Sequence, residues 1–239
     1  MSCDTYYLED GSSFKKSDLI YLGEGANARV WKCGNSAFKE FIPSHIGSGI
    51  DKRLGDIFSE INFSNLPNFY SFVRWSKSGD VPYIGYMMEY FEEDKKASIL
   101  DLPISTIVSS FRDLERDIEA ISDFNILMSD VTAYNTMITS DGKIHTFDYD
   151  TYLFSEGNDA LRRNKVTELK LLHGLFLYYT SKDTDISMED KIRYEEFFRK
   201  AFAIRNCYDR EVSGVVLDLF DKDRTPREGV KRLVYERFS

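Results

Sequence analysis

The sequence predicts an α+β protein in which a small lobe built on an antiparallel sheet precedes a larger helical lobe. Short runs of alternating apolar and polar residues dominate the first part of the chain, which is typical of strands. Apolar residues at helical spacing dominate the rest. A polar connector, EEDKKAS at 92–98, separates the two parts. We therefore expect a first lobe over residues 1–91 with one helix, a second lobe over residues 92–239, and a ligand in the cleft between them.

The strands of the first lobe follow from alternation and from turn residues. The stretch DLIYLGEGANARVWKCGNSAFKEF alternates, and Cys33-Gly34-Asn35-Ser36 predicts a tight hairpin turn within it. Apolar residues then recur at helical spacing until Pro67-Asn68, which ends the expected helix. The turn SKSGD at 76–80 joins the last two strands. The expected elements are strands at 29–32, 37–41, 69–75 and 83–91 and a helix at 50–66.

The second lobe is predicted from helical spacing with one interruption. A helix is expected at 104–124, and three or four more beyond Lys165, ending in EGVKRLVYERF. Between them, SDVTAYNTMITSDGKIHTFDYD at 129–150 predicts a short hairpin with Asp141-Gly142 at its turn.

Composition and charge narrow the class of protein. The net charge of −9 and the pI of about 5.0 disfavour nucleic acid and anionic membranes as partners. The N-terminus lacks the pattern of a signal peptide, and the richest apolar run, LLHGLFLYY, is too short to span a bilayer. Three scattered cysteines, Cys3, Cys33 and Cys207, indicate a reducing, cytoplasmic setting. No Cys/His cluster has the spacing of a zinc site.

A glycine-rich loop and a strand lysine form the first candidate site. Residues 23–30, GEGANARV, make a G-x-G-x-x-A-x-V loop whose glycines let backbone amides approach phosphate oxygens. A strand follows it, whereas a dinucleotide-binding loop needs a helix there. Lys39 in the next strand and Glu60 in the expected helix could pair beside this loop and hold nucleotide phosphates. A glycine hairpin without a ligand, a solvated lysine and a surface glutamate are the alternatives.

The stretch MMEYF, at 87–91, ends a strand just before the polar connector. Backbone groups of such a segment could bind the edge of an adenine ring, and core methionines are the alternative.

The richest set of candidate residues lies around the expected hairpin. Asp130 follows an apolar run and could accept the proton of an attacking hydroxyl. Asn135 and Asp148 could share a magnesium ion, a hard cation that prefers oxygen ligands. Capping and turn acids are the alternative for each residue, but all these features in one order are hard to assign to chance.

Taken in order, these motifs resemble the protein kinase superfamily from about Leu22 to the C-terminus. GEGANARV resembles the glycine-rich loop, AFK the lysine strand, and MMEYF the hinge with Met88 as gatekeeper. MSDVTAYN is similar to the catalytic loop and FDYD to the D-F-G motif. Glu168 resembles the acid that opens the central helix of the large lobe, and RTPREGV a late R-P-x segment.

The resemblance implies a two-lobed protein kinase-like fold that binds ATP and Mg²⁺ and transfers the terminal phosphate to a hydroxyl, in particular that of a protein Ser or Thr. It implies Asp130, Lys39 and Glu60 as catalytic residues, and Asn135 and Asp148 as metal ligands. The implied nucleotide-binding residues are Gly23, Glu24, Gly25, Val30, Ala37, Lys39, Met88, Glu89 and Phe91.

Departures from the family pattern keep two alternatives open. Asp150 replaces the glycine of D-F-G, and no A-P-E occurs before the central helix, which favours a small-molecule phosphotransferase such as the aminoglycoside and choline kinases. Met128 in the histidine position and Thr132 in place of a lysine favour a nucleotide-binding pseudokinase regulator. Ser129 stands where an arginine often reads a phosphorylated activation segment. We therefore expect activity that does not depend on phosphorylation at Thr151, Tyr152 or Ser155.

Overall fold

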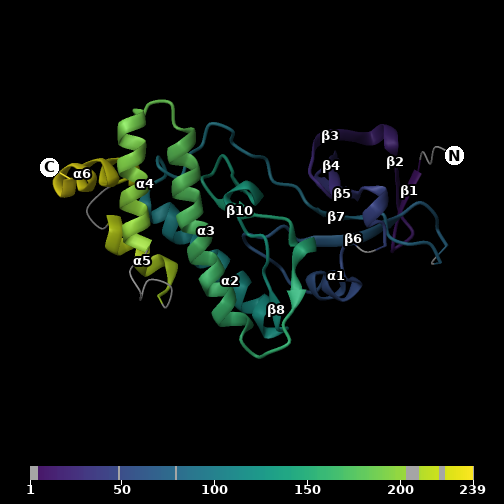
Figure 1. Ribbon diagram of the computed structural model, residues 1–239. Helices are drawn as coiled ribbons and strands as arrows, with labels where there is room; N and C mark the ends of the chain where they lie inside the picture. The colour runs from purple at the N-terminus through teal and green to yellow at the C-terminus, as the bar shows by residue number, and fades with distance from the viewer. Residues whose placement is uncertain (1–4, 48, 79, 203–209, 221–223, 239) are drawn as a thin grey trace. The chain divides into compact units, whose positions relative to one another are not determined.

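The computed structural model describes residues 5–47, 49–78, 80–202, 210–220 and 224–238 (Figure 1). Within these ranges lie six α-helices, a curled antiparallel sheet of seven strands and two sheets of two strands each, so the expected α+β class is confirmed. The chain divides into a first unit, Met1–Phe63 with Pro67–Phe91, and a second unit, Ser64–Leu66 with Glu92–Ser239.

The first unit is built on the seven-stranded sheet, whose order is β2-β1-β6-β7-β5-β4-β3. The strands expected from alternation are present, and the turn at Gly34-Asn35 joins β4 to β5, with Gly34 at a φ of 60°. The strands are β1 (Thr5–Leu8), β2 (Ser13–Lys15), β3 (Leu19–Glu24), β4 (Ala28–Cys33), β5 (Ser36–Phe41), β6 (Phe69–Arg74) and β7 (Gly85–Glu89).

The hairpin of β1 and β2 was not expected from the sequence. It turns at Gly11, whose φ of 84° is in the left-handed region that favours glycine. The Tyr6 ring on β1 lies 5.2 Å from Phe14 on β2 and 5.3 Å from Phe38 on β5. Two strands, β6 and β7, lie between β1 and β5 in the sheet order, so this contact requires the sheet to curl around an aromatic core.

Helix α1 (Lys52–Phe58) is much shorter than the helix expected at 50–66. Asp51 caps its start by accepting a hydrogen bond from the backbone N of Arg53 at 2.9 Å. Beyond its end, Phe63 N donates to the side chain of Asn68 at 2.8 Å. The backbone N–H groups of residues 64–66 donate to the side chain of Asp117. Because these donors bond side chains instead of helical carbonyls, the helical spacing does not continue as helix.

The second unit carries the other five helices. Helix α2 matches the helix expected at 104–124, and α3 begins before Lys165, where the sequence predicted the first helix of the final group. The Phe176 ring of α3 lies 4.8 Å from Phe198 on α4 and 5.5 Å from Phe220 on α5, which fixes the centre of this helical core. The helices are α2 (Ile104–Asp123), α3 (Ala160–Lys182), α4 (Met188–Phe202), α5 (Val212–Phe220) and α6 (Pro226–Phe238).

The segment Ser64–Leu66 belongs to the second unit because a buried carboxylate on α2 holds it. Asp117 accepts hydrogen bonds from the backbone N of Ser64 at 2.9 Å, of Asn65 at 2.6 Å and of Leu66 at 3.1 Å. Burial raises the pKa of Asp117, and these three donors act against that rise. The Asn65 side chain also donates to the carbonyl of Ile144 at 2.6 Å, so the segment is bonded on two sides.

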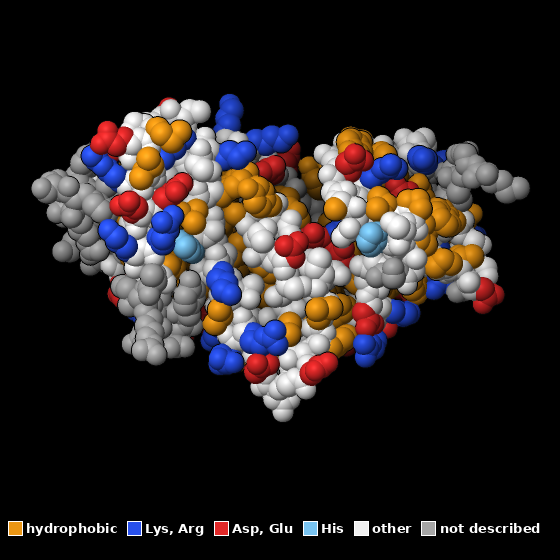
Figure 2. All heavy atoms as spheres, in the orientation of Figure 1, with side chains coloured by type: hydrophobic (Ala, Val, Ile, Leu, Met, Phe, Trp, Pro, Cys, Tyr) orange, Lys and Arg blue, Asp and Glu red, His pale blue; other side chains and the backbone are white. Residues whose placement is uncertain are grey.

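The surface of the helical unit is charged and mixed in sign. On the face shown in Figure 2, basic and acidic side chains are interspersed over this unit. On α4, Arg193 pairs with Glu189 at 2.6 Å and with Asp190 at 3.6 Å. No helix within the described ranges has both the length and the apolar character that crossing a membrane requires.

Candidate functional site

The glycine-rich loop is the tip of the β3–β4 hairpin. Gly25 N donates to the carbonyl of Ala28 at 2.9 Å, and Glu24 pairs with Arg29 at 3.4 Å across the base of the tip. A Cβ placed on Gly23 or Gly25 would meet nothing within 4 Å, and neither residue has a φ in the left-handed region. Neither packing nor backbone conformation therefore requires glycine here, so open space next to the loop is the feature that these two glycines provide.

One face of the sheet carries four of the predicted nucleotide contacts. Val30 pairs directly with Lys39, and Ala37 pairs directly with Met88. Paired residues project to the same face, and so do residues two apart on one strand, which places all four side chains together. Lys39 is only 8% exposed, and Ala37 and Met88 are buried beside it. Lys39 is thus a buried lysine on an apolar face rather than a solvated one.

Glu60 lies two residues beyond α1 instead of within a helix, and its side chain is exposed. The helix is short because the following residues bond elsewhere, as described above. The one acid that α1 itself carries is Asp56, which bonds Lys52 at 2.7 Å. The structure therefore does not supply a helical glutamate at the predicted position.

Glu89 ends β7 and is bonded to Asn68. Its backbone N donates to the carbonyl of Asn68 at 2.8 Å, and its carboxylate accepts from Asn68 Nδ2 at 2.7 Å. The amide of Glu89 is therefore occupied, and a ligand contact from this residue would use its carbonyl. Phe91 is the last residue of the first unit.

Asp130 and Asn135 lie in one loop of the second unit and are bonded to each other. The loop runs from β8 (Ile126–Leu127) through a 3-10 turn at Ala133–Asn135. Asn135 Nδ2 donates to the backbone carbonyl of Asp130 at 2.8 Å and to its Oδ2 at 3.2 Å. Asp130 is exposed and has a φ of 54°, a conformation that is uncommon outside glycine. The predicted proton acceptor is thus oriented by a predicted metal ligand.

A hairpin brings Asp148 to the same place. The strands β9 (Thr136–Ile138) and β10 (Ile144–Thr146) form the hairpin expected from the sequence, with Gly142 at a φ of 81° in its turn. At its open end, Phe147 N donates to the carbonyl of Asn135 at 2.9 Å. Asp148 follows directly, with a φ of 80°. The hairpin therefore places the second predicted metal ligand next to the first.

The donor set of this loop fits a magnesium ion. Because Asn135 turns its Nδ2 toward Asp130, its amide oxygen is directed away from Asp130 as an acceptor. Asp148 adds one carboxylate, and Mg²⁺ sites in nucleotide-binding enzymes use one or two carboxylates together with substrate phosphates. No group of three or more His, Cys, Asp or Glu in the described part of the chain could hold a metal ion.

Asn164 on α3 is a site residue that the sequence reasoning missed. Its Oδ1 accepts from the backbone N of Met128 at 2.9 Å, two residues before Asp130. Its Nδ2 donates to the carbonyl of Ile126 at 2.8 Å and to Ser122 Oγ at 3.0 Å. A buried asparagine that bonds the backbone at Ile126 and Met128, and Ser122 on α2, fixes the start of that loop. A polar residue at a core position of the helix was the signal that could have identified it.

Glu168, which the sequence pointed to at the opening of this helix, lies one turn beyond Asn164. It is buried, and its Oε1 has no hydrogen-bond partner among the described residues. Desolvation, followed by repulsion from Glu115, raises the pKa of Glu168 to about 9. Asn164, and not Glu168, is therefore the α3 side chain that bonds the backbone at Ile126 and Met128.

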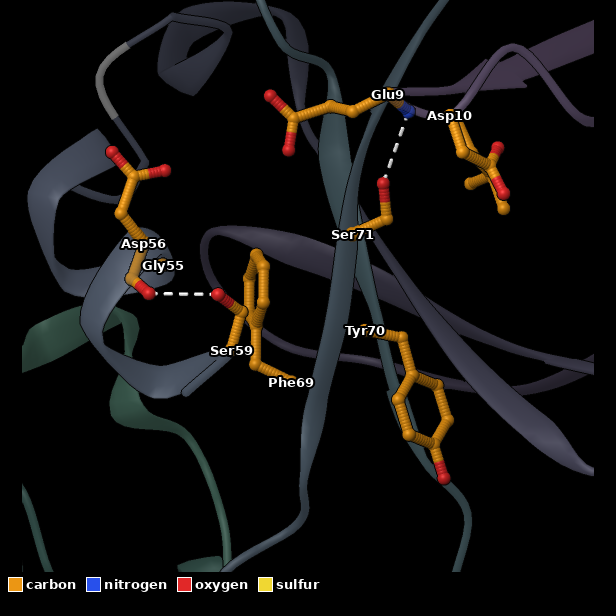
Figure 3. A pocket seen from close by; sticks show the side chains of 9 residues that line it. Glu9, Asp10, Gly55, Asp56, Ser59, Phe69, Tyr70 and Ser71 are labelled. Atoms are coloured by element: carbon orange, nitrogen blue, oxygen red, sulfur yellow. Dashed lines mark hydrogen bonds between the residues drawn. The ribbon is translucent and has the colours of Figure 1, made fainter. Parts of the chain in front are cut away.

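A pocket of about 340 Å³ lies in the first unit (Figure 3), and none of the residues that line it is a predicted site residue. It opens between the end of β1, helix α1 and β6, where Glu9 N donates to Ser71 Oγ at 3.0 Å. Its polar lining includes the carboxylates of Glu9, Asp10 and Asp56. Three carboxylates repel phosphate, so we do not place a nucleotide in this pocket.

Comparison of the chain with models of protein families gives no match, and neither does comparison with curated protein sequences. What the chain does must therefore follow from its own residues.

Proposed function

We propose that this chain is an ATP- and magnesium-dependent phosphotransferase with a two-lobed protein kinase-like fold, acting on the hydroxyl of Ser or Thr in a protein. The observation that carries the proposal is the bonding within the loop of the second unit that contains Asp130 and Asn135. There Asn135 bonds Asp130, and its carbonyl accepts from the residue before Asp148. The glycine loop and the buried Lys39 of the first unit add phosphate-binding groups of the kind that kinases use.

Each residue has a defined task in the proposed reaction. The acceptor oxygen bonds to the terminal phosphorus of ATP as the bond to the bridging oxygen breaks, and Asp130 takes the hydroxyl proton. Asn135 holds the Asp130 carboxylate in place. Asn135 and Asp148 would hold Mg²⁺, which would offset negative charge on the phosphate oxygens. Lys39 would pair with the phosphates, and the amide of Gly25 would approach them.

The length of the segment after Asp148 favours a second candidate, a small-molecule phosphotransferase. Only residues 149–159 separate Asp148 from α3. Part of this segment is already used by a 3-10 turn at Tyr149–Thr151 and by β11 (Leu153–Phe154), which pairs with β8. Little chain is left to dock a peptide, and Asp150 lies in the same segment. A small hydroxyl acceptor needs no such platform.

A pseudokinase is the third candidate, suggested by Met128 and Thr132. Met128 is buried and its amide bonds Asn164, which gives this residue a packing role.

Of the three cysteines, Cys33 is a free thiol, and Cys3 and Cys207 lie outside the described residues. The reducing cytoplasm stays part of the proposal on the basis of cysteine number and spacing.

Thermal denaturation with and without Mg-ATP tests the nucleotide and metal assignment. A ligand that binds only the folded state raises its melting temperature by mass action. We expect Mg-ATP to stabilise the wild type, and Asp148→Asn to lose most of the magnesium-dependent part of that shift. Asp123→Asn, at an exposed position at the end of α2, is the matched control and should respond as the wild type does. An unchanged magnesium response in Asp148→Asn would remove this residue from the metal site.

Transfer of labelled phosphate from ATP separates the three candidates. Labelling of a protein panel supports the main proposal, and labelling of small alcohols alone supports the second. Mg-ATP binding without any transfer supports the pseudokinase. An absence of both binding and transfer would overturn nucleotide chemistry for this chain.

A further inference from the structure

Ser129 and Thr151 bond each other in both directions across 22 residues of sequence. Ser129 Oγ donates to the carbonyl of Thr151, and Thr151 Oγ1 donates to the carbonyl of Ser129 at 2.9 Å. Thr151 Oγ1 also lies 3.2 Å from the carbonyl of Asp148. We call this pair the hydroxyl latch. It joins the residue before Asp130, the predicted proton acceptor, to the backbone of Asp148, the predicted metal ligand.

Both aspartates have backbone conformations that need support. The φ of Asp130 is 54° and that of Asp148 is 80°, in the left-handed region that costs free energy for residues with a Cβ. Such conformations persist only where the surrounding structure holds them, and they gather at functional sites. The latch bonds act directly at these two points, at the Asp148 carbonyl and at the carbonyl that precedes Asp130.

The latch is one end of a longer series of bonds that joins residues 125–129 to residues 151–155. Leu153 pairs with Leu127 where β11 meets β8. At the far end of this ladder, Ser155 N donates to the carbonyl of Asn125 at 2.8 Å, and Asn125 Nδ2 donates to the carbonyl of Ser155 at 2.9 Å. The ladder orders the two segments, and the latch is its last connection before the aspartates.

We propose that Ser129 and Thr151 are positioning residues, which hold Asp130 and Asp148 in the conformations that phosphotransfer requires. The proposal rests on the proposed function for its reaction, but the latch is a property of the chain itself. Two neutral hydroxyls would thus order the segment after Asp148 with no phosphate present. Phosphorylation of Thr151 would remove the proton that it donates to both carbonyls and would lower activity, so the independence of phosphorylation expected from the sequence would not extend to this residue.

Four variants test the latch. Thr151→Val and Ser129→Ala each delete one hydroxyl of it, Thr151→Ser keeps the hydroxyl, and Thr167→Val is the control. Thr167 is half-buried like Thr151 and also donates to a carbonyl, that of Arg163 at 3.1 Å, but it lies on α3 outside the site. The two readouts are steady-state phosphotransfer and hydrogen exchange of the backbone amides at 129–131 and 148–151.

We expect kcat to fall by about 10- to 100-fold in Thr151→Val and Ser129→Ala, because small displacements of reacting groups cost this much. The KM for Mg-ATP should rise as well, since the latch holds Asp148, the predicted magnesium ligand. Exchange at 129–131 and 148–151 should accelerate in these two variants. Thr151→Ser should restore both readouts, and Thr167→Val should alter neither.

The outcomes show whether the latch proposal fails, the proposed function fails, or both fail. Wild-type kcat and wild-type exchange in Thr151→Val and Ser129→Ala would overturn the latch while phosphotransfer stands. Loss of activity that Thr151→Ser does not restore, or that Thr167→Val shares, would also overturn it. A chain without phosphotransfer whose exchange accelerates only in the two deletion variants would support the latch and overturn the proposed function alone.

Discussion

At the scale of single residues, two glycines of the first unit show how a packing requirement differs from a ligand requirement. A Cβ on Gly55 would lie 2.3 Å from the Phe72 ring, so α1 can pack on the sheet only with glycine there. A Cβ on Gly25 would meet nothing within 4 Å. Since the chain itself does not require Gly25, we attribute this glycine to the approach of a phosphate.

Gly25→Ala should therefore change stability by less than about 0.5 kcal/mol, as is usual at open surface positions. It should weaken Mg-ATP binding, because the added methyl occupies the space that the ligand uses. Gly55→Ala, the control, should lower stability by about 2 kcal/mol through overpacking. Thermal denaturation and calorimetric titration measure the two effects. Unchanged Mg-ATP affinity in Gly25→Ala would place the phosphates away from the loop.

Lys39 gives a second prediction at this scale. Methionine is close to lysine in length and suits the apolar face, so Lys39→Met should keep the fold, as circular dichroism would show. Loss of the charge should lower phosphotransfer by about 100-fold or more, as expected for a group that stabilises transferring phosphate. Because Glu60 lies exposed beyond α1, Glu60→Gln should lower phosphotransfer by about twofold or less. Unfolding of Lys39→Met would instead make this lysine structural.

At the scale of elements, helix α3 determines where the loop that carries Asp130 begins. Asn164 bonds the backbone at both Ile126 and Met128, so β8 and the residues that follow it have a fixed distance from the helix. About four turns further along the same helix, the situation is reversed at Thr180, which is fully buried and whose Oγ1 has no hydrogen-bond partner among the described residues. The same helix thus offers one buried polar group with full bonding and one without.

Asn164→Ala should lower the free energy of unfolding by about 3 kcal/mol, because it removes three bonds and leaves a buried amide and carbonyl unpaired. Phosphotransfer should fall with it, since the loop that carries Asp130 loses its anchor. Thr180→Val, the matched control on α3, should be neutral or stabilising, because it removes a buried hydroxyl that bonds nothing. Chemical denaturation measures both. Equal effects of the two substitutions would show that Asn164 has no special anchoring role.

At the scale of the whole molecule, local signals were sufficient for some elements and insufficient for others. Turn chemistry at Gly34 and Gly142 predicted the β4–β5 and β9–β10 hairpins, and both are present. In the structure, the second hairpin lies between Asn135 and Asp148 and brings them close together. These elements depend on residues adjacent in sequence, so a single sequence contains the information.

The remaining elements depend on partners distant in sequence. The end of α1 is set by bonds such as those from Ser64 to Asp117, 53 residues away, which no local pattern reveals. The β1–β2 hairpin is held by contacts such as that between Tyr6 and Phe38. Asn164 could be assigned only once its bond to Met128 was known. Candidate residues such as Asp130 and Asn135, which the structure brings together, were thus predicted from the sequence, but the side chains that support them were not.

Glu168 makes stability depend on pH in the second unit. Burial first, and Glu115 next, raise its pKa from 4.5 to about 9, whereas Lys165 acts in the opposite direction. A carboxyl group whose folded pKa lies above its unfolded pKa favours folding only while it is protonated. This contribution is complete below pH 4.5 and is lost progressively as the pH rises to about 9. The wild type therefore carries a buried acid that opposes folding increasingly through the neutral range.

Glu168→Gln removes this titration, because glutamine has nearly the same shape and stays neutral at every pH. The variant should unfold close to the wild-type temperature at pH 5 and at a progressively higher temperature than the wild type as the pH is raised to 9. Thermal denaturation of both proteins over this range gives the difference directly. Glu196→Gln, at an exposed position on α4, should show no such trend. If the melting curves of Glu168→Gln and the wild type stay parallel across the range, Glu168 is ionised in the folded state and a cation outside the pairs described here must compensate its charge.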